Sequence, residues 1–412
     1  MTAGVADPAV AVDGPARRAR LWPLATGTFA IGFGSYVMAG LVPTVSADLG
    51  ISVSQVGTLV SVYGFTYAIS TPLLTLLVRR VPRQVLMGTA LALFALAAVG
   101  TALATTPTAV AVLRALSAVA AGGFTPTATV LAARLAPPGG SGRAVATVFG
   151  GLTTATVLGA PAGNLLGPLL GYRGVYALVA GLAAVALVSV LTLVRAGADA
   201  RARGADPHGG SGASGPGPGR RAAVGLVAVA LAVSSLETAG AMMVQTYASP
   251  LLTETAGIAG VLLSGVLLAY GVAGVAGNVA GGWLADLYGP GRSITIALTA
   301  STLALVLLAP AAVSPVAVIA VFSLWGFAAW AMNSPLQNVL LSLSGRHGQL
   351  VVALNSSVIS LGTGIGALLG GWVIGGPGYG ALGIVAAGVT FAAVLLTLVL
   401  GRRDAITRTA AS

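Results

Sequence analysis

Twelve apolar stretches, most of them joined by short connections, occupy nearly the whole of this chain. A helix needs about 20 apolar residues to cross the ~30 Å hydrocarbon core of a bilayer, and each stretch is close to that length or longer. The stretches cover residues 22–44, 54–78, 84–104, 107–133, 144–168, 174–195, 222–247, 258–284, 293–311, 315–341, 350–372 and 379–400. The sequence therefore predicts an all-α membrane protein with twelve transmembrane helices.

The composition argues against a soluble protein. Charged residues make up 7% of the chain and hydrophobic residues 56%, whereas about 25% of the residues of a soluble domain are charged. The 59 glycines fit the same interpretation, because glycine is more frequent in membrane helices than in soluble ones. We therefore expect the lipid bilayer to surround most of this chain.

The net charge of +11 comes from 20 arginines and 9 acidic residues, with no lysine. An excess of this size can indicate binding to nucleic acid. Here, however, the arginines lie in short groups between apolar stretches and form no basic face with interleaved aromatic residues. We therefore expect no nucleic-acid partner and interpret the arginines as signals of membrane topology.

Counted from a cytoplasmic N-terminus, 18 of the 20 arginines fall in tails or connections on one side of the membrane. Arg173 falls on the other side, and Arg114 lies inside a predicted helix. Because positively charged connections are retained in the cytoplasm, both termini and the central connection are predicted to be cytoplasmic. An alanine-rich chain without lysine suggests a bacterial genome, so we expect the protein in the bacterial cytoplasmic (inner) membrane.

A segment rich in glycine, serine and proline separates the sixth stretch from the seventh. It contains GGSGASGPGPG and almost no large apolar residue, which is typical of a disordered linker. The predicted organisation is a cytoplasmic tail at 1–21, a six-helix half at 22–195, a cytoplasmic linker at 196–221, a second six-helix half at 222–400 and a cytoplasmic tail at 401–412.

The two halves are related by an internal repeat. When the sequence is aligned with itself at an offset of ~207 residues, identical residues coincide along five helices without a gap. Many transporters are built from such internal repeats. The matched pairs are Pro43 with Pro250, Gly50 with Gly257, Gly64 with Gly271, Gly159 with Gly366, and Gly163 with Gly370. Because six helices form each copy, both copies have the same orientation in the membrane, and we expect the repeat axis along the membrane normal.

One acidic residue, Glu237, lies deep inside a predicted helix, in the segment ALAVSSLETAGAMMVQTY. Apolar surroundings disfavour the charged form of a carboxyl group. We therefore expect Glu237 to bind and release a proton near neutral pH, as a proton-coupled carrier requires. The alternative is that Ser234 and Ser235 hydrogen-bond Glu237 in a purely structural role.

Arg114 is the second charge placed within the membrane, in the segment AVLRALSAVAAGG. Such a charge is costly and by default indicates function, although the side chain could instead extend to the outer surface. At about 1.5 Å per residue, Arg114 and Glu237 lie at similar depths. We therefore expect ionised Glu237 to be drawn towards Arg114, closing the outer side, and protonation to release it.

The residue inventory leaves little material for catalysis. Cysteine is absent, and His208 and His347 fall in predicted connections, which excludes thiol chemistry and Cys/His metal sites. One buried acid and one buried arginine offer no set of paired catalytic groups. We expect no metal, no cofactor and no enzymatic activity.

The first and eleventh helices carry segments with a family likeness, GTFAIGFGSYVMAGLVPTVSADLGIS and LNSSVISLGTGIGALLGG. With the twelve-helix pattern, they resemble the major facilitator superfamily, in particular twelve-span drug:proton antiporters of the arabinose-efflux-like and chloramphenicol-efflux-like branch. The resemblance covers nearly the whole chain. It implies two six-helix halves related by a pseudo-two-fold axis along the membrane normal, and transport by alternating access.

The superfamily motif G-x-L-A-D-R-x-G-R is matched in the second half by Gly282, Asp286 and Gly289. In the first half the equivalent stretch is TLLVRRVPR, without the glycine and the aspartate. The resemblance implies that Asp286 forms a cytoplasmic lock, which we expect to involve Arg143 at the start of the fifth helix. A solvated acid without this role is the alternative.

The antiporter motif G-x-x-x-G-P-x-x-G is matched loosely by Gly159, Pro161 and Gly163. Small residues four apart let two helix backbones approach closely. We expect Gly277 and Gly281 of the eighth helix to supply the complementary surface. Ordinary helix packing is the alternative.

The resemblance also implies that helices 1, 4, 7 and 10 line a central cavity. The candidate cavity residues on these helices are Phe33, Tyr36, Met242, Met243, Gln245, Trp330, Asn333 and Gln337. Aromatic and methionine side chains with a few amides suit an uncharged or weakly charged amphipathic molecule. Core packing would explain any one of these residues equally well.

We therefore expect a monomeric antiporter that exports a small organic or drug-like compound in exchange for protons. An uptake symporter or uniporter for a sugar or another small metabolite shares the fold and is the alternative. A membrane-embedded enzyme and a non-transporting sensor are rivals from other classes, and a flux assay would distinguish the sensor.

Overall fold

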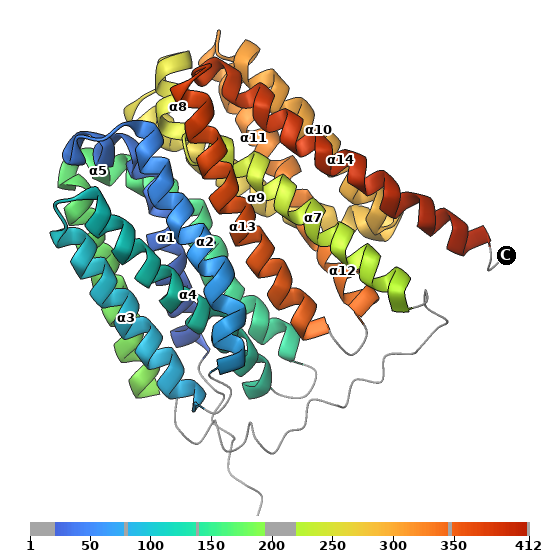
Figure 1. Cartoon of the computed structure of the whole chain (residues 1–412), viewed down its shortest axis with the longest axis horizontal. Coiled ribbons are helices and arrows are strands. Elements are labelled where there is room, and N and C mark those ends of the chain that lie inside the picture. The colour runs from blue at the N-terminus through green and yellow to red at the C-terminus, as the bar shows by residue number, and fades with distance from the viewer. Residues whose placement is uncertain (1–20, 78–80, 137–139, 194–219, 345–347, 410–412) are drawn as a thin grey trace, which may run out of the picture.

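The computed structural model describes residues 21–77, 81–136, 140–193, 220–344 and 348–409 (Figure 1). Every regular element in these residues is a helix. The helices are α1 (Trp22–Leu49), α2 (Val53–Leu77), α3 (Arg83–Leu103), α4 (Pro107–Leu135), α5 (Ser141–Leu193), α7 (Arg220–Gln245), α8 (Ala248–Ala256), α9 (Gly260–Tyr288), α10 (Pro290–Ala311), α11 (Pro315–Ala331), α12 (Asn333–Ser344), α13 (Gly348–Gly375) and α14 (Tyr379–Thr409).

Ten helical segments of the described residues are long and apolar enough to cross a membrane. One of them, α5, has 53 residues, and a straight helix of that length would measure about 80 Å. The backbone of α5 leaves the helical conformation at Gly171 (φ 64°, ψ 170°), so α5 supplies two spans. With α2, which has 25 residues, the described chain agrees with twelve spans, and the predicted all-α membrane fold is confirmed.

The ends of the helices explain why the predicted stretches fold separately. Proline occupies the first turn of α4, α10 and α11, where its missing N–H costs nothing. Gly50 after α1 and Gly257 after α8 both end their helices in the left-handed conformation, each with φ 63°, which glycine adopts without strain. Short turns therefore connect consecutive spans.

The tenth span differs from its prediction. A single helix was expected over 315–341, but α11 ends at Ala331 and α12 begins at Asn333. The short helix α8 was not expected at all. The break between α11 and α12 interrupts a continuous apolar pattern, whereas α8 occupies the connection between two predicted stretches.

The predicted tails and linker fall largely outside the described residues, namely positions 1–20, 194–219 and 410–412. Within the described part, α7 begins at Arg220, so the last two residues of the predicted linker are helical. Helix α14 continues to Thr409 and takes in most of the predicted tail at 401–412.

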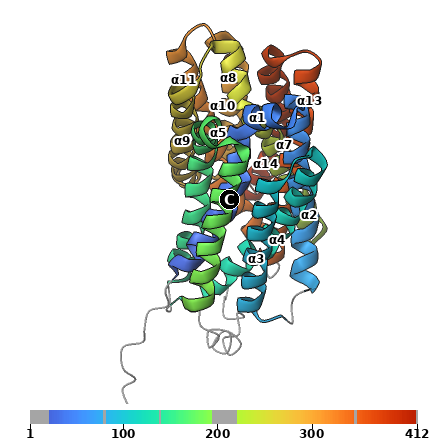
Figure 2. The ribbon, with the colours of Figure 1, turned by 90° about the vertical axis from the view of Figure 1, so that its left-hand side faces the viewer.

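Each half packs by the same scheme. In the first half α1 packs on α5, α2 on α4, and α3 on both α4 and α5. In the second half α7 packs on α13 and α14, α9 on α11, and α10 on α11 and α14. The spans run roughly parallel to one another in both views (Figure 1, Figure 2).

Among the described residues, the main contacts between the halves are those of α2 with α13, α5 with α9, and α1 with α8. In Figure 1, α2 and α13 lie side by side near the end of the bundle that carries α8, and they separate towards the other end. We call these the α8 end and the opposite end. Tyr247 is fully buried at the α8 end, where its hydroxyl donates to the Ala367 carbonyl (2.7 Å) and touches Gly57 of the first half.

The glycines matched by the internal repeat occupy equivalent places. Gly64 of α2 lies against α13, and its counterpart Gly271 of α9 lies against α5. Both positions therefore face the seam between the halves. Gly163 faces the α1 backbone, and its counterpart Gly370 faces the α7 backbone within the other half.

Candidate functional site

Two charged side chains are buried among the described residues, and both were predicted as site residues. Arg114 on α4 is 2% exposed, and Glu237 on α7 is 6% exposed. They belong to different halves of the bundle. Because a buried charge is costly, the partners of each decide what the site can do.

Arg114 is held entirely within the first half. Its Nη1 donates to the Gly34 carbonyl (2.9 Å) and to the Tyr176 hydroxyl (3.3 Å). The Tyr63 ring covers the guanidinium at 4.4 Å from the ring centroid, a cation–π contact. Ser35 fixes Tyr63 in turn, by donating from Oγ to its hydroxyl (2.6 Å). Arg114 therefore does not extend to the surface.

The surroundings of Glu237 are different. No hydrogen bond or ion pair with another described residue reaches its carboxylate. Ser234 Oγ is buried without a hydrogen-bond partner, so Ser234 does not bond Glu237. The Tyr270 hydroxyl of α9 lies in the vicinity of Glu237. Glu237 is therefore a buried acid without a hydrogen-bond or ion-pair partner among the described residues.

The predicted pairing of Glu237 with Arg114 is wrong for this conformation. The halves are closed at the α8 end, yet no ion pair between these residues contributes to the closure. Arg114 already has three partners in its own half. Equal depth along two helices did not bring the groups together, because α4 turns Arg114 towards Gly34, Tyr176 and Tyr63 of its own half.

Three tyrosines that the sequence analysis did not name lie on α2 and α9 and join the predicted Tyr36; they are Tyr63, Tyr67 and Tyr270. Tyr36 lies beside Thr156 in the first half, and Tyr270 lies close to Trp330 in the second. Tyr63 and Tyr67 stack with ring centroids 6.3 Å apart, and Tyr270 packs 4.7 Å from Trp325. We call Tyr36, Tyr63, Tyr67 and Tyr270 the tyrosine belt. The four-residue spacing of Tyr63 and Tyr67 was the available sequence signal.

The predicted cavity residues fall into two groups. Tyr36 is half-buried beside Thr156, and Trp330 is half-buried over Gly274 and close to the Tyr270 hydroxyl. These two belong to the same central region as Glu237. The other six predicted cavity residues make no described contact with this region.

Met243 is fully buried and packs against Gly370 of α13, so it belongs to the core of the second half. Met242 is half-buried against Gly366, and Gln245 is 7% exposed near the end of α7. Phe33 is buried and stacks on Phe29 with ring centroids 5.7 Å apart. Asn333 is half-buried and Gln337 exposed, both on α12.

The motif glycines pack inside the halves. Gly159 and Gly163 face α1, where an added Cβ at Gly163 would collide with the Val37 carbonyl. Pro161 is also buried in α5. Gly277 and Gly281 face the backbone of α11, so the expectation that they complement the α5 motif is wrong. Close backbone packing is real at both places, but each contact is with a neighbour in the same half.

Asp286 and Arg143 are both exposed, and no ion pair joins them in this conformation. Gly282 lies near Ser334, and Gly289 links α9 to α10 with φ 84°. The halves separate towards this opposite end. The cytoplasmic lock therefore stays a prediction, for a conformation that is closed there.

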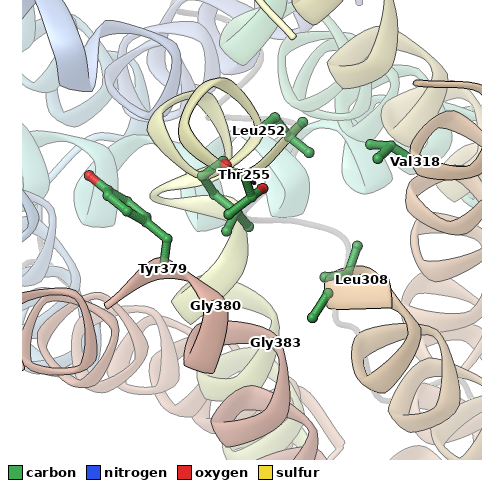
Figure 3. A pocket seen from close by; sticks show the side chains of 9 residues that line it. Leu252, Thr255, Leu308, Val318, Tyr379, Gly380 and Gly383 are labelled. Atoms are coloured by element: carbon green, nitrogen blue, oxygen red, sulfur yellow. Dashed lines mark hydrogen bonds between the residues drawn. The ribbon is translucent and has the colours of Figure 1, made fainter. Parts of the chain in front are cut away.

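Two hollows lie at the α8 end, away from the charged residues. Figure 3 shows one in the second half, lined by α8, α10, α11 and α14 with Leu252, Leu308 and Tyr379 among its residues. Its volume of about 20 Å³ holds roughly one water molecule. A shallow groove of about 380 Å³ lies between α2 and α13, beside Trp372. Neither contains a predicted site residue.

Sequence comparisons add relatives to this geometry. A profile described as Major Facilitator Superfamily matches residues 24–349. YdhP of Escherichia coli (strain K12), an inner membrane transport protein, is 30% identical over 392 residues, which cover 93% of this chain and 96% of YdhP. A chloramphenicol resistance protein of Streptomyces lividans is 31% identical over 394 residues, with coverages of 95% and 97%.

Solved structures show the same fold at low sequence identity. The nucleoside transporter NupG superposes with a TM-score of 0.69 at 14% identity, covering 92% of this chain and 99% of its own. A bacterial homolog of the human lysosomal transporter Spinster, solved in an inward-facing and unoccupied conformation, superposes with a TM-score of 0.67 at 16% identity. It covers 92% of this chain and 94% of its own.

Proposed function

Since the chain belongs to the major facilitator superfamily of membrane transporters, we propose that it exports a small organic compound in exchange for protons. The superfamily consists of transporters rather than enzymes, and the chain is a multi-pass membrane protein of this kind. Direction, proton coupling and substrate class are the proposed parts. Each is supported by a different observation.

The observation that carries proton coupling is Glu237, a carboxyl group that is 6% exposed and has no ion-pair partner among the described residues. A permanently charged group in that position would be costly. A group that alternates between a protonated and an ionised form can instead couple its charge to a change of conformation. Arg114 has a structural part in the proposed site, because its guanidinium contacts Gly34, Tyr176 and Tyr63 and so links three helices of the first half.

The substrate region we propose is the tyrosine belt together with Trp330. These rings offer broad apolar faces with hydroxyl or indole N–H groups at their edges. Such a surface suits an uncharged or weakly charged amphipathic compound. The name of the Streptomyces lividans relative, a chloramphenicol resistance protein, supports export of an inhibitory compound rather than uptake of a nutrient.

The experiment that tests this function compares cells with and without the gene across a panel of inhibitory compounds, including phenicols. Export predicts that expression lowers the accumulation of at least one compound and that collapsing the proton gradient restores it. Higher accumulation on expression would instead identify an uptake carrier. Efflux that survives collapse of the gradient would contradict proton coupling.

The proposed topology places both termini and the central linker in the cytoplasm, and the α8 end outside. Reporter fusions after Leu49, Thr106 and Thr253 should therefore report an external location, because these positions lie at the α8 end. Fusions within 196–221 should report the cytoplasm. An external linker would contradict the arrangement in the bacterial inner membrane that the arginines predict.

A further inference from the structure

A network of hydrogen bonds crosses the seam between α5 and α9, and its donors, Asn164 and Ser264, are not among the predicted motif residues. Asn164 of α5 donates from Nδ2 to the Gly260 carbonyl (3.0 Å) and to the Ser264 hydroxyl (2.7 Å) of α9. Ser264 Oγ in turn donates to the Pro161 carbonyl of α5 (3.3 Å). Each helix thus supplies one donor and one carbonyl acceptor to the other.

The network lies at the α8 end. Gly260 is the first residue of α9, and Asn164 lies seven residues before the break in α5 at Gly171. Deeper along the same seam, contact is made by packing alone, where Gly271 lies against the Val157 backbone. The hydrogen bonds therefore lie where α5 and α9 must separate when the α8 end opens.

The network can form only when α5 and α9 lie together, because each of its bonds joins a group of one helix to a group of the other. Asn164 is half-buried and Ser264 is buried, and polar side chains in such contacts hold membrane helices together. When α5 and α9 separate, Asn164 Nδ2 loses two acceptors and Ser264 Oγ loses both a donor and an acceptor. Closure at the α8 end satisfies these groups within the protein.

We propose that Asn164 and Ser264 form a latch that holds the transporter closed at its α8 end and sets how often that end opens. Neither Glu237 nor a substrate is part of the latch. Its strength should be matched to the cycle, because a latch that is too strong would keep the α8 end closed and one that is too weak would leave it open.

The test measures the conformational equilibrium directly, without substrate or a proton gradient. The chain has no cysteine, so spin labels can be attached to cysteines introduced at Thr105 and Val313, which are exposed connections of different halves at the α8 end. Distances between the labels report opening. In Asn164→Ala and in Ser264→Ala, the ratio of open to closed molecules should rise roughly three- to thirtyfold.

The double variant should show less than the product of the two single effects, because both residues belong to one network. Thr154→Ala is the matched control, since its exposed hydroxyl bonds to the Gly150 carbonyl within α5 itself (2.8 Å), and it should leave the distances unchanged. Asn164→Leu, which removes the donor but keeps the number and branching of the side-chain heavy atoms, provides a second variant if Asn164→Ala fails to fold.

Unchanged distances in folded Asn164→Leu and Ser264→Ala would overturn the latch, as would independent effects in the double variant. Neither outcome bears on export, because no flux is measured. Conversely, loss of the proposed export function would leave the distance measurement valid.

Discussion

Replacing Glu237 by glutamine is expected to reduce gradient-driven efflux to the level of cells that lack the gene. Glutamine keeps the size of the side chain and its capacity for hydrogen bonds, but it cannot exchange a proton. Among the described residues Glu237 is the one buried acid, so no second buried carboxyl group can take over its role. Binding of the exported compound to the purified protein should persist, because the tyrosine belt is unchanged.

Efflux is measured in everted vesicles energised with a proton gradient, and binding is measured separately in detergent. Glu254→Gln is the matched control, because it makes the same chemical change at an exposed acid on α8 and should leave efflux intact. Wild-type efflux against a gradient in Glu237→Gln would contradict proton coupling through this residue.

Replacing Gly64 by leucine is expected to force α2 and α13 apart and to prevent closure at the α8 end. An added Cβ at Gly64 would lie 2.7 Å from both the Gly364 nitrogen and the Ser360 carbonyl oxygen, and backbone atoms cannot move aside as side chains do. Overpacking typically costs about 1–3 kcal/mol, which shifts a two-state population by roughly five- to 150-fold. Because a transporter must visit both states, efflux should fall steeply.

The spin-label pair at Thr105 and Val313 measures this shift together with efflux. Gly181→Leu is the matched control, because nothing lies within 4 Å of a Cβ at that position. If the Gly64→Leu variant is folded, active and closed at the α8 end, then α2 and α13 need not pack this closely.

The helices themselves were predictable because the bilayer imposes a simple condition on sequence. A span must be apolar over about 20 residues, so all twelve stretches could be read without knowledge of their partners. The repeat was also readable, since matched glycines such as Gly64 and Gly271 serve equivalent packing positions. The break between Ala331 and Asn333 was missed because it interrupts the helix without interrupting the apolar pattern.

The candidate site was predictable only in part. Burial of Glu237 and Arg114 followed from their positions in apolar stretches, and the structure places both below a tenth of full exposure. Their partners did not follow, because a hydrogen bond depends on which face of a helix meets which neighbour. The sequence predicted that Arg114 would attract Glu237, whereas Gly34, Tyr176 and Tyr63 hold it in the first half.

By itself, then, the sequence determined the class of the protein, the number and place of its spans and the identity of its buried charges. These properties depend on the cost of moving each residue from water into an apolar environment, and that cost can be judged from the residue and its neighbours along the chain. Only the tertiary structure decided the contacts between stretches. It directed Gly163 towards α1 and Gly277 towards α11, and it assigned the crossing between α5 and α9 to Asn164 and Ser264. These choices depend on the rotation and approach of whole helices, which no local pattern specifies.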